Sequence, residues 1–223
     1  MILVFDLDDT LYDELTYVRS GFRVVAGYIE KTYAISEERV FSLFEHQMQK
    51  GRGAIFDAAF QELGIFSKRL VRRCVGLYRL HRPEIELYPA ALRCLERFHH
   101  YPIYIVTDGN INAQKNKLIA LGFYNRPPVQ RCYLTYRYGR KHVKPSPYCF
   151  FKIAEAEGVT SADVCYIADN PHKDFVGIKP FGFKTVRVLT GQHRYTRKSI
   201  EYEANYEISS LDQLTEGFFD EIS

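Results

Sequence analysis

Residues 1–13, MILVFDLDDTLYD, contain the stretch that decides the fold. An unbroken apolar run from Ile2 to Phe5 ends in Asp6, and a short apolar run closed by an acid is typical of a buried parallel strand. In open α/β sheets the reactive groups gather at the carboxyl ends of the strands, which is where Asp6 and Asp8 fall. A spacing of two directs both carboxylates into one crevice as the strand gives way to a loop.

This acidic pair has two interpretations. Two clustered carboxylates repel each other without a cation, and a hard divalent ion with oxygen ligands is the natural partner of Asp6 and Asp8. The simpler interpretation is a buried strand followed by an acidic turn that caps the next helix. The stretch by itself leaves both open.

Length and composition indicate a globular, core-forming protein. The chain has 223 residues, of which 46% are hydrophobic and 15% aromatic, enough for one packed domain with a smaller insert. A net charge of +3 gives no reason to expect nucleic acid or a membrane as a partner. We also expect no signal peptide and no membrane span. The five cysteines are odd in number and widely spaced, so reduced thiols in a cytoplasmic protein are expected.

The rest of the chain predicts a helical block set into an α/β domain. Residues 14–83 have apolar residues at helical spacing and no strand pattern, with helix starts predicted at Ser36 and Ser67. This block either packs on the core as ordinary helices or forms a lid, and its length favours a lid. Residues 1–13 and 84–223 alternate strands with helices, which predicts a Rossmann-like parallel sheet flanked by helices.

Polar residues follow two further strand-like segments. The run from 103 to 106 leads into Thr107, Asp108 and Gly109, with Asn110 as the expected cap of the next helix. A hydroxyl group and main-chain N–H groups at a helix N-terminus suit a phosphate oxygen, although an ordinary strand-to-helix turn has the same pattern.

The strand predicted at 164–168 is followed by ADNPHKD, which contains Asp169 and Asp174. The start of this segment also fits an Asx turn. In the basic loop before it, Lys144 is followed by Pro145 and Pro147, which stiffen the backbone.

The stretch DLDDTL resembles the first signature of the haloacid dehalogenase-like superfamily, most of whose members are Mg-dependent phosphohydrolases. Three later stretches match in the family's order: Thr107-Asp108-Gly109-Asn110, Lys144 in KPSP, and Asp169 with Asp174. The similarity extends from residue 1 to about residue 190. Dehalogenase members lack the second acid, so Asp8 favours phosphate chemistry. The family usually has Gly where this chain has Ala168.

The resemblance implies roles for these residues. Asp6 corresponds to the nucleophile and Asp8 to the general acid/base. Mg²⁺ would be held by Asp6, the main-chain carbonyl of Asp8 and Asp169, with Asp174 orienting the metal shell or Lys144. The resemblance also singles out Lys144 from the neighbouring basic residues, as an ammonium that neutralises phosphate and nucleophile charge. It further implies that the inserted helices form an all-helical cap.

These patterns predict a Mg²⁺-dependent phosphomonoester hydrolase that forms an aspartyl-phosphate intermediate. The expected substrate is a small cytosolic metabolite: a sugar phosphate, a nucleotide or FMN. Thr107, Asp108, Gly109 and Lys144 are the predicted substrate-binding residues of the core, and Thr107 and Lys144 are also predicted to be catalytic, with Asp6 and Asp8. Arg52 is the predicted substrate contact in the helical block.

Two alternatives stay open. One is a phosphomutase of the same fold, which Asp9 argues against because mutase-like members have Gly there. The other is a non-catalytic module that binds phosphate or a partner, which the intact pair Asp6 and Asp8 argues against. Either a monomer or a homodimer is compatible with the sequence.

Overall fold

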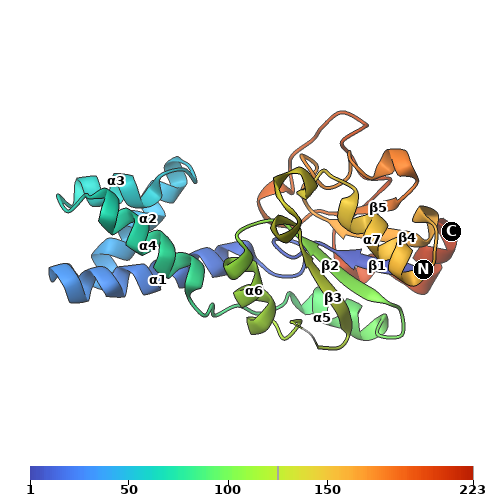
Figure 1. Cartoon of the computed structure of the whole chain (residues 1–223), viewed down its shortest axis with the longest axis horizontal. Helices are drawn as coiled ribbons and strands as arrows, with labels where there is room; N and C mark the ends of the chain where they lie inside the picture. Colours follow the sequence, from blue (N-terminus) through green and yellow to red (C-terminus); the bar gives the residue numbers. More distant parts are fainter. Residues whose placement is uncertain (125, 223) are drawn as a thin grey trace. The chain divides into compact units, whose positions relative to one another are not determined.

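A computed structural model describes residues 1–124 and 126–222 and contains a six-stranded sheet (Figure 1). The strand order is β3-β2-β1-β4-β5-β6, and all neighbouring strands are parallel. The strands are β1 (Ile2–Phe5), β2 (Ile103–Thr107), β3 (Val129–Leu134), β4 (Val164–Ala168), β5 (Lys184–Val188) and β6 (Tyr206–Ile208). The predicted Rossmann-like α/β fold is confirmed, and β1, the apolar strand that leads into Asp6, lies inside the sheet.

The described residues include eight α-helices. They are α1 (Glu14–Tyr33), α2 (Glu37–Lys50), α3 (Ile55–Glu62), α4 (Lys68–Leu80), α5 (Pro89–Arg97), α6 (Ile111–Ala120), α7 (Tyr148–Glu157) and α8 (Glu216–Ile222). Both serines predicted to start helices precede one, but only the Ser67 side chain accepts a capping hydrogen bond, from the Leu70 N–H. Ser36 makes no side-chain capping hydrogen bond.

The chain divides into two compact units, Met1–Glu14 with Ile85–Ser223 and Leu15–Glu84. The second unit contains helices and no strand within the described residues. Its interior is a cluster of aromatic rings: the Phe44 ring lies 5.2 Å from that of Phe22 and 5.0 Å from that of Phe56, measured between centroids. Because the helices of this unit have no sheet to pack on, packing between aromatic rings holds them together.

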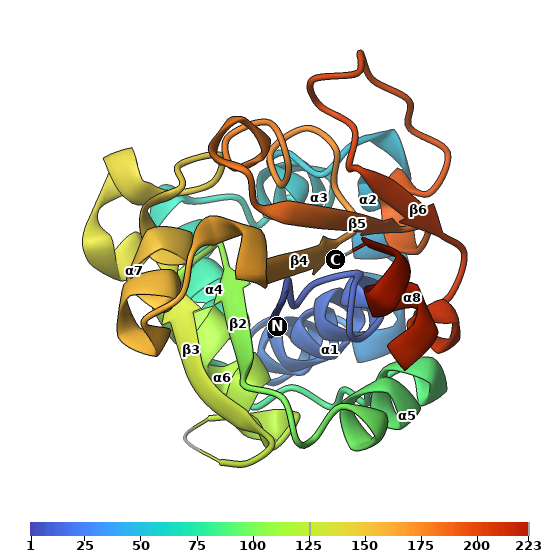
Figure 2. The same cartoon turned by 90° about the vertical axis from the view of Figure 1, so that its right-hand side faces the viewer.

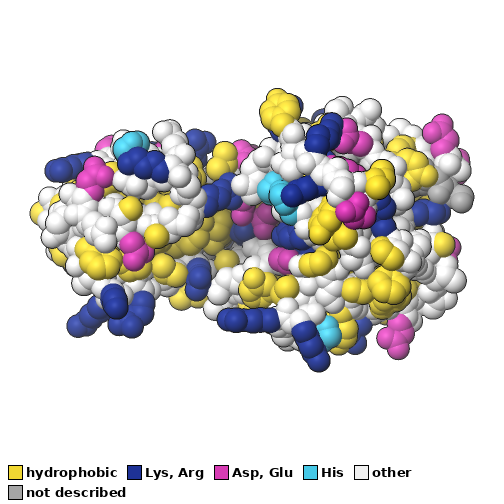
Figure 3. Space-filling model, turned by 90° about the horizontal axis from the view of Figure 1, so that it is seen from above, with side chains coloured by type: hydrophobic (Ala, Val, Ile, Leu, Met, Phe, Trp, Pro, Cys, Tyr) yellow, Lys and Arg dark blue, Asp and Glu magenta, His cyan; other side chains and the backbone are white. Residues whose placement is uncertain are grey.

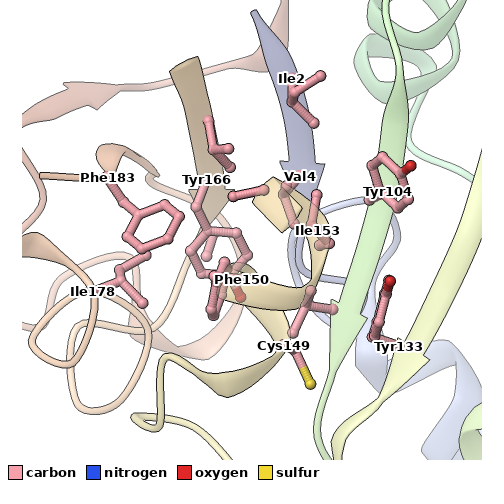
Figure 4. Close-up of a cluster of buried hydrophobic side chains, with 14 of the residues drawn as sticks. Ile2, Val4, Tyr104, Tyr133, Cys149, Phe150, Ile153, Tyr166, Ile178 and Phe183 are labelled. Atoms are coloured by element: carbon pink, nitrogen blue, oxygen red, sulfur yellow. The ribbon is translucent and has the colours of Figure 1, made fainter. Parts of the chain in front are cut away.

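The first unit is layered, with helices on both faces of its sheet (Figure 2). On one face α7 packs Phe150 and Ile153 against the side chains of Val4 and Tyr166 (Figure 4). Helices α5 and α8 lie on the opposite face (Figure 2). Because successive strand residues point to opposite faces and both faces are covered, β1 is apolar at every position.

All five cysteines are free, as predicted. Burial raises the pKa of the Cys165 thiol to about 12, and it raises the pKa values of Cys74, Cys94 and Cys132 similarly. Thiolate is the reactive form of cysteine, so these side chains serve as small apolar core residues.

The surface is mixed in charge. Basic and acidic side chains are interspersed on the face shown in Figure 3, in keeping with the small net charge of +3. Among the described residues, no helix combines the length and apolar character needed to cross a membrane.

Candidate functional site

Three acidic side chains meet at the carboxyl ends of β1 and β4. Asp6 and Asp169 directly follow these two neighbouring parallel strands, and the Asp6 N–H donates to the Ile167 carbonyl at 2.9 Å. Asp174 joins them from the loop after β4. One carboxylate oxygen from each of the three lies within 4.8 Å of the others, and all three residues are buried.

Lys144 lies among these acids although it comes from a distant loop. Its ammonium is 2.7 Å from Asp6 Oδ1 and 2.8 Å from Asp174 Oδ1. It also donates to the Tyr166 hydroxyl at 2.9 Å, and its side chain is only 1% exposed. The lysine that the sequence patterns select is therefore ion-paired with the first acid, 138 positions away along the chain.

The acidic cluster carries more negative charge than Lys144 neutralises. Burial, only partly offset by Lys144, raises the pKa of Asp6 to about 6. Burial and the neighbouring carboxylates of Asp174 and Asp6 raise the pKa of Asp169 well above its usual value. Buried carboxylates that resist ionisation in this way gain stability from a bound cation, and an all-oxygen donor set suits a hard divalent ion such as Mg²⁺. The residues present therefore fit the metal that the sequence predicts.

Asp8 lies outside this acidic cluster, with its carboxylate bound by other groups. Lys117 Nζ is 2.6 Å from Asp8 Oδ1, and Gln114 Nε2 donates to Asp8 Oδ2 at 2.7 Å. The Tyr12 hydroxyl also donates to Oδ1. Burial alone would raise the Asp8 pKa, but the Lys117 charge and these hydrogen bonds lower it overall. The predicted metal contact of Asp8 is through its main-chain carbonyl and does not involve its carboxylate.

The end of β2 and the turn after it contain Thr107, Asp108 and Gly109, three of the predicted substrate-binding residues. Thr107 is 1% exposed, and its Oγ1 accepts a hydrogen bond from Gln114 Nε2 at 2.5 Å. Asn110 caps α6 as predicted, because its Oδ1 accepts from the main-chain N–H groups of Asn112 and Ala113. Gly109 has φ +132°, a backbone conformation that side-chain-bearing residues rarely adopt. The hydroxyl of Thr107 keeps its own hydrogen for a further acceptor.

The Asp108 carboxylate supports the loop that contains Lys144. It accepts hydrogen bonds from Thr135 Oγ1 at 2.5 Å and from the Lys144 main-chain N–H at 3.2 Å. Lys173 Nζ lies 3.7 Å away. Through these contacts Asp108 holds the Lys144 loop in place, in addition to its predicted contact with substrate.

The helix-capping interpretation of the opening acids applies to Asp9. Its Oδ1 accepts from the N–H of Glu14, the first residue of α1, at 3.0 Å. Its Oδ2 accepts from the Gln192 N–H at 3.1 Å. The cap and the candidate chemistry thus belong to different acids of one motif, with Asp6 and Asp8 directed elsewhere.

Arg52, the predicted substrate contact outside the core, lies in the second unit. It is exposed in the turn between α2 and α3. The structure brings together Asp6, Lys144, Asp169 and Asp174, and links Asp8 to Thr107 through Gln114.

Sequence reasoning missed Tyr166 and the two side chains of α6 that hold Asp8. A signal for the latter was present, because the inward face of α6 carries Gln114 and Lys117 beside Ala113 and Leu118. Polar side chains on the buried face of a helix need hydrogen-bond or ion-pair partners. The acids at the ends of the neighbouring strands were the candidate partners. Tyr166 gave no signal, since a tyrosine in a buried strand is ordinary.

A glycine keeps the Lys144 loop close to the Asp174 loop. A Cβ added at Gly177 would lie 1.6 Å from the Pro145 carbonyl oxygen, so the backbone after Lys144 would have to move. We expect Gly177→Ala to lower stability by about 1–3 kcal/mol, as overpacking does, and to reduce turnover. The matched change Gly76→Ala meets open space in α4 and should stabilise by up to about 1 kcal/mol. Calorimetric melting of both variants checks the opposite signs.

The parallel sheet and its acidic strand ends define a class of hydrolase. The family model for haloacid dehalogenase-like hydrolases matches residues 1–182, and the chain belongs to this family, as its motifs predicted. Among its relatives is the glyceraldehyde 3-phosphate phosphatase of Methanocaldococcus jannaschii, 26% identical over 96% of this chain and 95% of the relative. The enzyme of the same name from Pyrococcus furiosus is also 26% identical, over 96% of this chain and 91% of its own.

Solved structures agree on the fold. The magnesium-bound HAD-hydrolase YfnB from Bacillus subtilis superimposes with a TM-score of 0.66 over 100% of this chain and 98% of its own. Its sequence identity is 17%, so the likeness supports the fold and carries no statement about substrate.

Proposed function

We propose that the protein is a Mg²⁺-dependent phosphomonoesterase that acts through an aspartyl-phosphate on Asp6. The observation that carries this proposal is the separation of two neighbouring acids into different surroundings. Asp6 lies with Lys144 in the acidic cluster, whereas Asp8 is held by Lys117 and Gln114. Two carboxylates of one motif with different partners suit different tasks, one as nucleophile and one as proton carrier.

The metal would be held by the carboxylates of Asp6 and Asp169 and the main-chain carbonyl of Asp8, with Asp174 beside them. When bound it would neutralise charge on the transferring phosphoryl group. Lys144 would do the same from the protein side, and the contacts of its ammonium with Asp6 and Asp174 support this role. Thr107 and the N–H groups at the start of α6 would receive the phosphate oxygens.

The reaction would proceed in two displacements at phosphorus. A carboxylate oxygen of Asp6 forms a bond to phosphorus as the ester P–O bond breaks, and Asp8 gives a proton to the departing oxygen. Water then attacks the phosphoryl group on Asp6 and loses its proton to Asp8, which releases inorganic phosphate. The charge of a bound phosphate opposes the effect of Lys117 on Asp8, so substrate binding favours the protonated acid that the first displacement needs.

A small sugar phosphate is the proposed substrate class, ahead of a nucleotide or FMN. Relatives of similar length that are named glyceraldehyde 3-phosphate phosphatases support this choice. We propose that the helical unit Leu15–Glu84 acts as the substrate-selecting cap, with Arg52 as a contact for the substrate. Arg52→Ala is then expected to raise KM for the preferred substrate with little change in kcat.

The experiment that tests the proposal is phosphate release from a panel of metabolites, with Mg²⁺ and with EDTA. Glyceraldehyde 3-phosphate, other sugar phosphates, nucleotides and FMN form the panel, and p-nitrophenyl phosphate reports general phosphatase activity. We expect metal-dependent release that is fastest with a sugar phosphate. A folded, Mg²⁺-binding protein that releases phosphate from no compound would overturn the proposal.

A further inference from the structure

Helix α6 presents two buried polar side chains to the base of the site. Gln114 is 2% exposed and Lys117 is 4% exposed. They are three residues apart, which places them on one face of the helix. Buried amide and ammonium groups are costly unless they are bonded, and both of these bond to the strand-end residues.

Their contacts form a continuous chain from the phosphate-binding turn to the second acid. Gln114 Nε2 donates to Thr107 Oγ1 at 2.5 Å and to Asp8 Oδ2 at 2.7 Å. Lys117 Nζ lies 2.6 Å from the other oxygen, Asp8 Oδ1. Each oxygen of Asp8 is therefore held by a side chain of α6, with the Tyr12 hydroxyl also donating to Oδ1, while 21% of the Asp8 side chain stays exposed.

The backbone provides room for this arrangement. Gly109 begins the turn into α6, and a Cβ there would lie 3.3 Å from Cγ and Cδ of Gln114. The Asn110 cap fixes the first turn of the same helix. The turn that would bind phosphate and the side chains that hold Asp8 thus belong to one continuous segment, the turn and the helix α6 that follows it.

We infer that Gln114 and Lys117 are a positioning pair, which aims the Asp8 carboxyl at the leaving-group oxygen and ties its position to the phosphate held at Thr107. This inference rests on the proposed phosphomonoesterase function. Neither residue needs to touch the substrate, because both act through Asp8. Proton transfer to a poor leaving group depends on the orientation of the Asp8 carboxyl, whereas a leaving group that departs as a stable anion needs no proton.

The test compares two substrates in Lys117→Met: glycerol 3-phosphate, whose alkoxide needs a proton, and 2,4-dinitrophenyl phosphate, whose phenolate does not. We expect kcat/KM for the alkyl ester to fall about 10- to 100-fold more than that for the aryl ester. Gln114→Ala should show the same pattern to a smaller extent. Lys115→Met, on the same helix, is the control with both rates near wild type.

A double-mutant cycle with Asp8 makes the inference falsifiable. If Lys117 works through Asp8, Lys117→Met should cost almost nothing further in an Asp8→Asn background. Equal losses on both substrates, or additive losses in the cycle, would show a merely structural role and overturn the inference. A wild-type protein inactive on both esters and on every compound of the metabolite panel would instead refute the proposed function, and melting temperatures identify any variant that fails to fold.

Discussion

Asp6→Asn is expected to lower phosphate release by about a thousandfold or more, because an amide cannot attack phosphorus and form the acyl phosphate. The change keeps the shape of the side chain and an acceptor oxygen for Lys144, which lies 2.7 Å from Oδ1 in the wild type. Steady-state rates at saturating Mg²⁺ measure the loss. Wild-type enzyme quenched during turnover should carry one phosphoryl group at Asp6 by peptide mass spectrometry.

The same variant should melt at a higher temperature than the wild type in EDTA at pH 7. Burial raises the Asp6 pKa from 3.8 to about 6, so the unfolded chain ionises first as the pH rises. The metal-free wild type therefore loses stability between these two pH values, and the amide variant does not. Asp220→Asn, an exposed acid on α8, is the control with unchanged activity and melting. Substantial turnover by Asp6→Asn would exclude Asp6 as the nucleophile.

Lys144→Met is expected to be the most destabilising single substitution at the site, by about 3–5 kcal/mol in EDTA, because it leaves buried acids without their cation. The Lys144 ammonium is within 2.8 Å of both Asp6 and Asp174, and the side chain is 1% exposed. Turnover should fall at least about a hundredfold, since the positive charge beside the transferring phosphoryl group is lost. Chemical denaturation and phosphate release measure the two effects.

Mg²⁺ should restore part of the lost stability in Lys144→Met, since a divalent ion supplies the missing positive charge. Lys141→Met removes an exposed lysine from the same basic loop and should change stability by less than about 0.5 kcal/mol. Equal stability of the two variants in EDTA would contradict the view that Lys144 neutralises the acidic cluster.

The strand-end residues were predictable from the sequence for a physical reason. Asp6, Thr107 and Asp169 each stand at or just after the end of a short apolar run. Parallel strands in one sheet share a carboxyl edge, so the prediction of a parallel sheet already brings these side chains toward one another. The pairing of β1 with both β2 and β4 places all three ends side by side.

Lys144 could be selected by family resemblance, but not placed. It stands in a loop with other basic residues, and nothing local distinguishes its burial from the exposure of Lys141. Its position depends on contacts with residues distant in the sequence. The Asp108 carboxylate accepts a hydrogen bond from the Lys144 main-chain N–H, and Gly177, which has no Cβ, leaves space for the Pro145 carbonyl.

By itself, the sequence determined the α/β fold, the helical insert and the acids at the strand ends, because strand and helix periodicity are local properties of the chain. Only the tertiary structure decided which acid received which partner. Asp6 pairs with Lys144, Asp8 binds Gln114 and Lys117, and Asp9 caps α1. Such assignments depend on the rotation of a helix and the path of a loop, which long-range packing fixes and no short stretch of sequence encodes.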